Sequence, residues 1–105
     1  MASLRPLPSS VAGYFQLPFS DYVNARVLAA NTAETIAIPT GAKYVLFSAD
    51  GDFYVRSNDT ATIPAADVAD GTAAILNPTL RSLETVTSLS VIASAARIVT
   101  AAFYL

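Results

Sequence analysis

The sequence predicts an all-β fold, an antiparallel β-sandwich of about seven or eight strands. From Asp21 onward, runs of β-branched and aromatic residues alternate with turn residues at short intervals, which is typical of an all-β chain. No segment has the period of an amphipathic helix. The chain has 105 residues, the common size of a single domain. We therefore expect one sandwich over residues 21–105, with the jelly roll as one form that it can take, preceded by an arm over residues 1–20.

Residues 1–20 are expected to be extended. They contain three of the six prolines, and each proline fixes its own φ and biases the preceding residue toward extended conformations. Fully extended, the arm reaches about 65 Å. Disordered tails are normally polar, whereas this arm is apolar, so we expect either its own domain or a neighbouring subunit to cover it. Its apolar residues are Leu4, Leu7, Val11, Tyr14, Phe15, Leu17 and Phe19.

Seven strands are predicted between clusters of turn residues, and Thr60–Ile63 is a candidate for a further short strand. The segment Pro64–Pro78 is rich in Ala, Asp and Gly, and we expect a loop with room for one helical turn. The predicted strands are Tyr22–Ala29, Glu34–Ile38, Lys43–Ala49, Asp52–Ser57, Leu80–Glu84, Val86–Ala93 and Arg97–Tyr104.

Two of the early connections contain turn residues. Ala30–Ala33 includes Asn31, which tolerates the left-handed conformation. Ile38–Gly41 has Pro at the second position and Gly at the fourth, as a type I turn prefers. Each segment therefore predicts a short turn between two strands.

The dipeptide Asp50-Gly51 lies between two apolar runs and predicts a β-hairpin with a two-residue type I′ turn. Both faces of that hairpin would be largely apolar, and the last strand has the same property. Because an antiparallel sheet usually leaves one face to water, we expect a second covering layer. The hairpin would carry Tyr44, Leu46, Phe53 and Val55 on one face and Val45, Phe47, Tyr54 and Arg56 on the other.

The residue types exclude most catalytic chemistry. Cys and His are both absent, so disulfides, thiolate nucleophiles, His-based triads and ordinary zinc sites are ruled out. The acidic pairs Asp50/Asp52 and Asp67/Asp70 lack the spacing of an EF-hand loop, and we interpret them as turn residues. We expect a protein that is not an enzyme, with no catalytic residue, metal, cofactor or small-molecule substrate.

The charge pattern favours contacts between subunits. The net charge is −2 and charged residues make up 13% of the chain, about half of the roughly 25% typical of soluble domains. This charge predicts no nucleic-acid partner. The N-terminus lacks the apolar core of a signal peptide, and Leu89–Leu105 has Arg97 at its middle, which argues against a membrane span. We expect a homo-oligomer.

Aromatic residues and Arg are enriched where subunits meet, which selects candidate contact residues on the arm and on the strands. An alternative interpretation is a glycan-binding module, in which exposed Tyr side chains stack on sugar rings. The interface candidates are Leu7, Tyr14, Phe15, Leu17, Phe19, Phe47, Tyr54, Arg56 and Phe103.

Four motifs follow one another from Glu34 to Pro78: IP-x-GA at 38–42, V-x-FSA-x-GDFYV at 45–55, IPAADV-x-DGT at 63–72 and LNP at 76–78. In these motifs the chain resembles a family of small virion proteins of tailed bacteriophages. The last strands, VTSLSVIASAARIVTAAFYL, also fit that family's closing hairpin, which ends in an aromatic pair. The resemblance covers about three quarters of the chain and leaves out the arm.

The resemblance implies a β-sandwich packed into a virion, as a cement or decoration protein on the head. Its expected partners are the major capsid protein or other virion proteins, and its expected location is the virion, assembled in the host cytoplasm. A position in the neck, collar or tail is the alternative within the particle.

Overall fold

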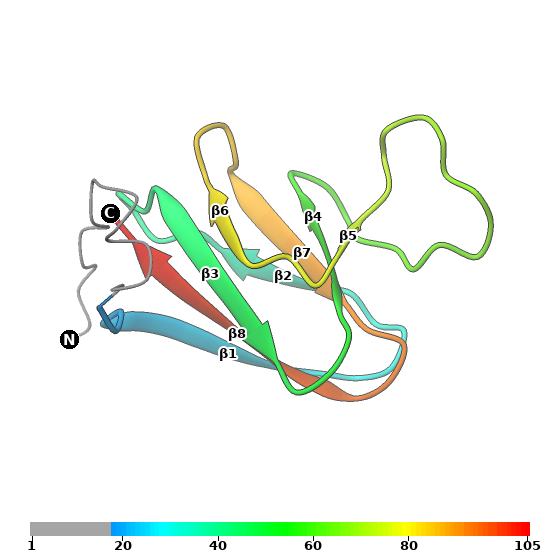
Figure 1. The fold of residues 1–105 in the computed structure, drawn as a ribbon, viewed down its shortest axis with the longest axis horizontal. Coiled ribbons are helices and arrows are strands. Elements are labelled where there is room, and N and C mark those ends of the chain that lie inside the picture. The colour runs from blue at the N-terminus through cyan, green and yellow to red at the C-terminus, as the bar shows by residue number, and fades with distance from the viewer. Residues whose placement is uncertain (1–17) are drawn as a thin grey trace.

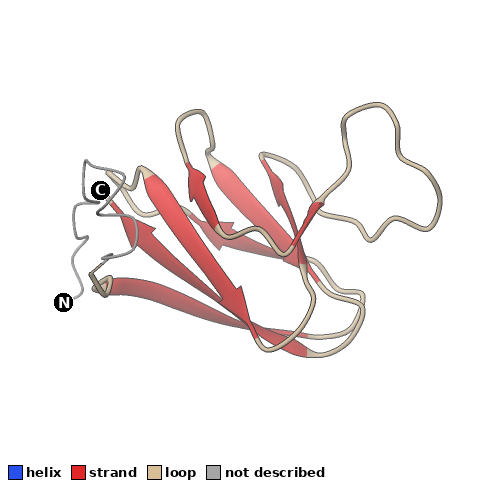
Figure 2. Cartoon of the chain, viewed as in Figure 1, coloured by secondary structure: helices blue, strands red, loops and turns tan. Residues whose placement is uncertain are grey.

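Two four-stranded antiparallel sheets pack face to face in the computed structural model, which describes residues 18–105 (Figure 1). Sheet A has the strand order β1-β8-β3-β6 and sheet B has the order β2-β7-β4-β5. None of the described residues lies in a helix (Figure 2), and the predicted all-β sandwich is confirmed. The strands are β1 (Tyr22–Leu28), β2 (Glu34–Ala37), β3 (Tyr44–Ala49), β4 (Tyr54–Ser57), β5 (Ile75–Leu76), β6 (Leu80–Ser82), β7 (Ser88–Ile92) and β8 (Arg97–Tyr104).

The strand pairing is that of a jelly roll. β1 pairs with β8, β2 with β7, β3 with β6 and β4 with β5, as when one long hairpin is rolled up into two sheets. Every connection except that from β4 to β5 passes from one sheet to the other. Most successive strands are therefore joined by arches rather than by hairpins. Within the described residues there is no helix that could cross a membrane.

The core lies between the two sheets and comes from alternate residues of each strand, because successive strand residues face opposite sides. Two aromatic contacts fill it: the rings of Phe47 and Phe53 are 6.0 Å apart between centroids, and those of Tyr22 and Phe103 meet edge to face at 6.1 Å. The buried core residues include Leu28, Val45, Val99 and Ala101 of sheet A and Ile36, Val55, Leu89 and Val91 of sheet B.

The hairpin predicted at Asp50-Gly51 is wrong. β3 belongs to sheet A and β4 to sheet B, and neither residue of the dipeptide has the positive φ that a type I′ turn requires. Asp50 instead continues the pairing with β8: its N–H donates to the Ile98 carbonyl at 3.3 Å and its Oδ1 accepts from the Ile98 N–H at 3.0 Å. The arch places Phe47 and Phe53 inside the core together, and burial of both rings outweighs the local turn preference.

Two other expectations about connections need correction. β7 and β8 lie in different sheets, so the closing hairpin implied by the resemblance does not form. The turn after β2 closes one residue later than predicted, because the Ala42 N–H donates to the Pro39 carbonyl at 3.1 Å. Gly41 takes a φ of +86°, as the third position of a type II turn requires. The left-handed conformation expected at Asn31 is confirmed, with φ at +59°.

The predicted strands all exist, with ends shifted by one or two residues in most cases. The segment at 60–63 is not a strand. A two-residue strand, β5, lies inside the stretch expected to be a loop, and that loop contains no helical turn. β5 is too short for a hydrophobic period to indicate it.

Candidate functional site

The outer face of sheet A is the largest uncharged surface that the strand register identifies. The pairings across β1, β8, β3 and β6 place Val23, Ala102, Leu46 and Leu80 in one row across all four strands. A second row joins Val27 to Ile98. None of the side chains on this face carries a charge. The outer face of sheet A consists of Val23, Ala25, Val27, Tyr44, Leu46, Ser48, Leu80, Ser82, Ile98, Thr100, Ala102 and Tyr104.

Three aliphatic side chains on this face are exposed to an unusual degree. Val27 is 73% exposed, Val23 49% and Ile98 48%. The nearest charges lie at the margins of the face. The Asp50 carboxylate, just beyond β3, accepts the Ile98 N–H at 3.0 Å, and Arg26 of β1 reaches toward Glu34 of β2, with Nη1 and Oε1 3.8 Å apart. An apolar face framed by polar edges is the arrangement typical of a contact surface.

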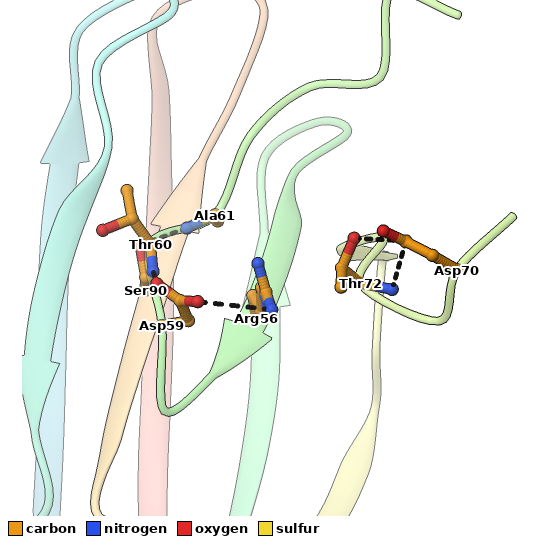
Figure 3. A network of polar contacts seen from close by, with 7 residues as sticks. All are labelled: Arg56, Asp59, Thr60, Ala61, Asp70, Thr72 and Ser90. Atoms are coloured by element: carbon orange, nitrogen blue, oxygen red, sulfur yellow. Dashed lines mark hydrogen bonds and ion pairs between the residues drawn. The ribbon is translucent and has the colours of Figure 1, made fainter. Parts of the chain in front are cut away.

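Sheet B differs, because its own chain crosses part of its outer face. After β4 the extended segment 59–63 lies on β7, where the Ala61 N–H donates to Ser90 Oγ at 2.8 Å and both residues are buried (Figure 3). Arg56 on the same face pairs with Asp59, with Nη2 and Oδ2 3.3 Å apart. In the described part of the chain, sheet B is thus partly covered and carries charge. On the outer face of sheet A only Tyr104 is buried, and the charge beside that face is that of Asp50 at its margin.

The residues that lead into β1 are fastened to the end of β8. The Tyr104 hydroxyl donates to the Pro18 carbonyl at 2.7 Å. Ser20 Oγ donates to the Phe103 carbonyl and accepts from the Tyr22 N–H, the latter at 3.0 Å. Because Tyr104 belongs to the outer face of sheet A, the chain at Pro18 lies beside that face.

The structure divides the interface residues predicted from the sequence into four groups. Leu7, Tyr14, Phe15 and Leu17 lie outside the described residues. Phe19 is 94% exposed beside Pro18. Tyr54 and Arg56 are half-buried on the outer face of sheet B.

Phe47 and Phe103 need correction as contact residues. They are 6% and 0% exposed and belong to the core between the sheets. Their role in the folded chain is therefore packing. Alternation along a strand shows that two residues share a face, but it does not say which face is internal.

Sequence reasoning missed Val23 and Val27, although a signal was present. Along β1, the set Val23, Ala25 and Val27 is uniformly apolar while the other set contains Asn24 and Arg26. Alternation in that form normally places the apolar set inside. The structure does the reverse, because Leu28 is buried and Val27 is exposed. Arg26 lies on the same side of β1 as Leu28, but β1 is at the edge of the sheet, where Arg26 pairs with Glu34.

Several of the carboxylates make local structural contacts. Asp52 accepts a hydrogen bond from Asn77 Nδ2 at 2.9 Å, and Asp70 Oδ1 accepts from the Thr72 hydroxyl and N–H (Figure 3). The hydrogen bond from the Thr72 hydroxyl holds the pKa of Asp70 below its usual value of 3.8. No group of three or more metal-ligating side chains occurs within residues 18–105.

A cavity of about 140 Å³ opens between the sheets beside β6. Its walls are core side chains such as Val45, Val55 and Leu89, and Arg81 is the one titratable residue among the described residues that line it. Such a lining offers apolar contact but no pair of groups for acid–base work.

Comparisons of the chain with protein-family models, with curated proteins and with solved structures found no match.

Proposed function

We propose that this chain is a non-enzymatic structural protein of a bacteriophage virion, a cement or decoration subunit that stabilises the particle through contacts between subunits. The observation that carries the proposal is the uncharged outer face of sheet A. A face with half-exposed Val and Ile side chains gains free energy when a partner removes it from water.

The size of that gain is considerable. Fully burying one Val or Ile side chain contributes about 1.5–3 kcal/mol, and Val23, Val27 and Ile98 are each about half exposed or more. The rest of the sandwich does not offset this with surface charge, since charged residues make up only 13% of the chain. Assembly with other subunits supplies the cover that the described part of the chain does not provide for this face.

The fold supports the proposal without deciding it. Jelly rolls occur in viral capsid proteins, and also in lectins and cupins, so the fold alone does not assign a role. The motif resemblance at Glu34–Pro78 favours the virion. A position in the neck or tail is the alternative within the same proposal.

The glycan-binding alternative receives less support. A stacking platform needs Tyr rings with a free face, whereas Tyr104 is 2% exposed and holds the Pro18 carbonyl. Tyr22, Tyr44 and Tyr54 are only partly exposed, and the ring of Tyr22 packs on Phe103. Tyr22 therefore packs within the sandwich, while Tyr44 and Tyr54 lie partly covered on the outer faces.

Purified virions of the phage that encodes the chain test the proposal. We expect mass spectrometry to find the chain in many copies per particle, and particles that lack it to release their DNA at lower temperature. Adding back the purified chain should restore heat resistance. Virions without the chain, or particles of unchanged heat resistance after its loss, would contradict a cement function.

A charge placed on the outer face of sheet A tests the surface itself. We expect Ile98→Asp to abolish the restored heat resistance, because an aspartate there would have to be desolvated on assembly. Ala37→Asp is the matched control, since Ala37 is exposed on the outer face of sheet B, and it should restore heat resistance as the unmodified chain does. Equal restoration by both variants would place the contact elsewhere.

A further inference from the structure

The uncharged outer face of sheet A lies beside the point at which the N-terminal segment enters the sandwich. Pro18 is the first described residue, and its carbonyl accepts the Tyr104 hydroxyl at one end of that face. Seventeen residues precede Pro18. The apolar N-terminal segment therefore enters the sandwich at the Tyr104 end of the outer face of sheet A.

The chemistry of the segment matches the face. Residues 1–17 contain one charged side chain, Arg5, and the strand residues of the face contain none, with Asp50 as the charge at its margin. The apolar side chains of the segment are spread along its length, from Leu4 to Leu17. Their apolar character suits the rows Val23–Leu80 and Val27–Ile98.

We propose that residues 1–17 of one chain cover the outer face of sheet A of a second copy. This deepens the proposed function and rests on it, because it names the partner that occupies the assembly surface. Two copies whose A sheets face each other exchange their N-terminal segments reciprocally, so that one contact satisfies both faces.

One observation favours a second copy over the chain's own face, and a second allows it. Phe19 is 94% exposed directly after Pro18, so the junction does not pack its aromatic ring on its own domain. Seventeen residues can span about 56 Å when extended, more than the 39 Å of the domain's longest dimension, so the segment is long enough to reach a neighbouring copy. Pro6 and Pro8 disfavour a helical or tightly folded segment that would shorten this reach.

Cysteine cross-linking of the full-length protein tests the exchange, because the chain has no Cys of its own. Val11→Cys is placed on a chain with a mass tag and Ile98→Cys on an untagged chain, and the two are refolded together and oxidised. Neither chain can form an internal disulfide. We expect a disulfide-linked band that contains one tagged and one untagged chain. Leu7→Cys and Phe15→Cys on the tagged chain cover the neighbouring registers.

Ala37→Cys replaces Ile98→Cys in the matched control, because it is exposed on the opposite side of the sandwich. We expect no mixed band with it. A chain that carries both Val11→Cys and Ile98→Cys separates the two arrangements: the exchange predicts linked dimers, whereas an internally linked monomer at all protein concentrations would overturn the proposal. Absence of any Ile98 cross-link at all three registers would overturn it as well.

The cross-link is measured on the purified protein and the proposed function on virions, so the two can fail separately. A chain that cross-links only within itself and is still abundant in virions would refute the exchange alone. A chain that exchanges its segments and is absent from virions would refute the virion function alone.

Discussion

Asn58 joins the end of β4 to the segment that leads into β7. Its N–H donates to the Ser88 carbonyl at 2.9 Å, its Oδ1 accepts from the Thr87 N–H at 2.7 Å, and its Nδ2 donates to the Thr85 carbonyl at 3.1 Å. It does so at a φ of +61°, a conformation that Asn tolerates better than most residues. We expect Asn58→Ala to lower the free energy of unfolding in urea by about 1–3 kcal/mol.

The control for Asn58 is Asn58→Gly, which adopts positive φ without strain but lacks the side-chain bonds. If the bonds matter, the glycine variant is also destabilised, and the alanine variant more so. A glycine variant as stable as the unmodified chain would show that the backbone conformation alone is what Asn58 supplies.

Ser90 is a buried polar residue, 4% exposed, whose Oγ accepts the Ala61 N–H (Figure 3). Removing the hydroxyl leaves the buried Ala61 N–H without its hydrogen-bond partner. We expect Ser90→Ala to lower the free energy of unfolding by about 1–3 kcal/mol. Ser48→Ala, at an exposed position of β3, should change it by less than about 0.5 kcal/mol. Equal effects of the two substitutions would contradict the covering role of residues 59–63.

Asp70 titrates in the loop between β4 and β5, where the Thr72 hydroxyl lowers its pKa from the ordinary 3.8. A lowered pKa in the folded chain means that the charged form is favoured there. Its stabilising contribution is present above the ordinary value and is lost as the pH falls through the lowered one. We expect Thr72→Val to raise the pKa of Asp70, measured by NMR titration of the carboxyl carbon. No change on substitution would contradict the assigned hydrogen bond.

At the scale of an element, the arch between β3 and β4 depends on a glycine for space rather than for φ. A Cβ on Gly51 would overlap the Nε and Cδ atoms of Arg97, the first residue of β8. We expect Gly51→Ala to lower the free energy of unfolding by about 1 kcal/mol, because the flexible Arg97 side chain can move aside at a cost. Most of that loss should vanish in an Arg97→Ala background, as a double-mutant cycle of urea unfolding would measure. The same loss in both backgrounds would show that Arg97 is not the obstacle.

The same arch shows what local sequence signals could and could not predict. The strands themselves were predictable, because β-branched runs between turn residues mark them directly. The partner of each strand was not, since Asp50-Gly51 favours a hairpin locally, whereas the folded chain places β3 and β4 in opposite sheets with Phe47 and Phe53 packed together in the core. Pairing depends on contacts distant in sequence, and β5 has only two residues, too few to show a period.

At the scale of the whole molecule, the candidate surface was only half predictable. Low charge indicated a chain that packs against partners, and this followed from composition. The location of the surface required the register, because Val23 and Val27 lie outward only once Leu28 is known to face the core. For the same reason, the sequence did not show whether Phe47 and Phe103 face the core or a partner, and they were wrongly chosen as interface candidates.

The solution mass of the full-length chain and of Ile98→Asp, measured by size-exclusion light scattering, tests most directly the claim that the outer face of sheet A joins subunits. We predict an oligomer for the unmodified chain and a folded 11.0 kDa monomer for Ile98→Asp, with unchanged circular dichroism and with Ala37→Asp still oligomeric. An unmodified chain that is monomeric at all concentrations, or an oligomer that Ile98→Asp leaves intact, would contradict the account.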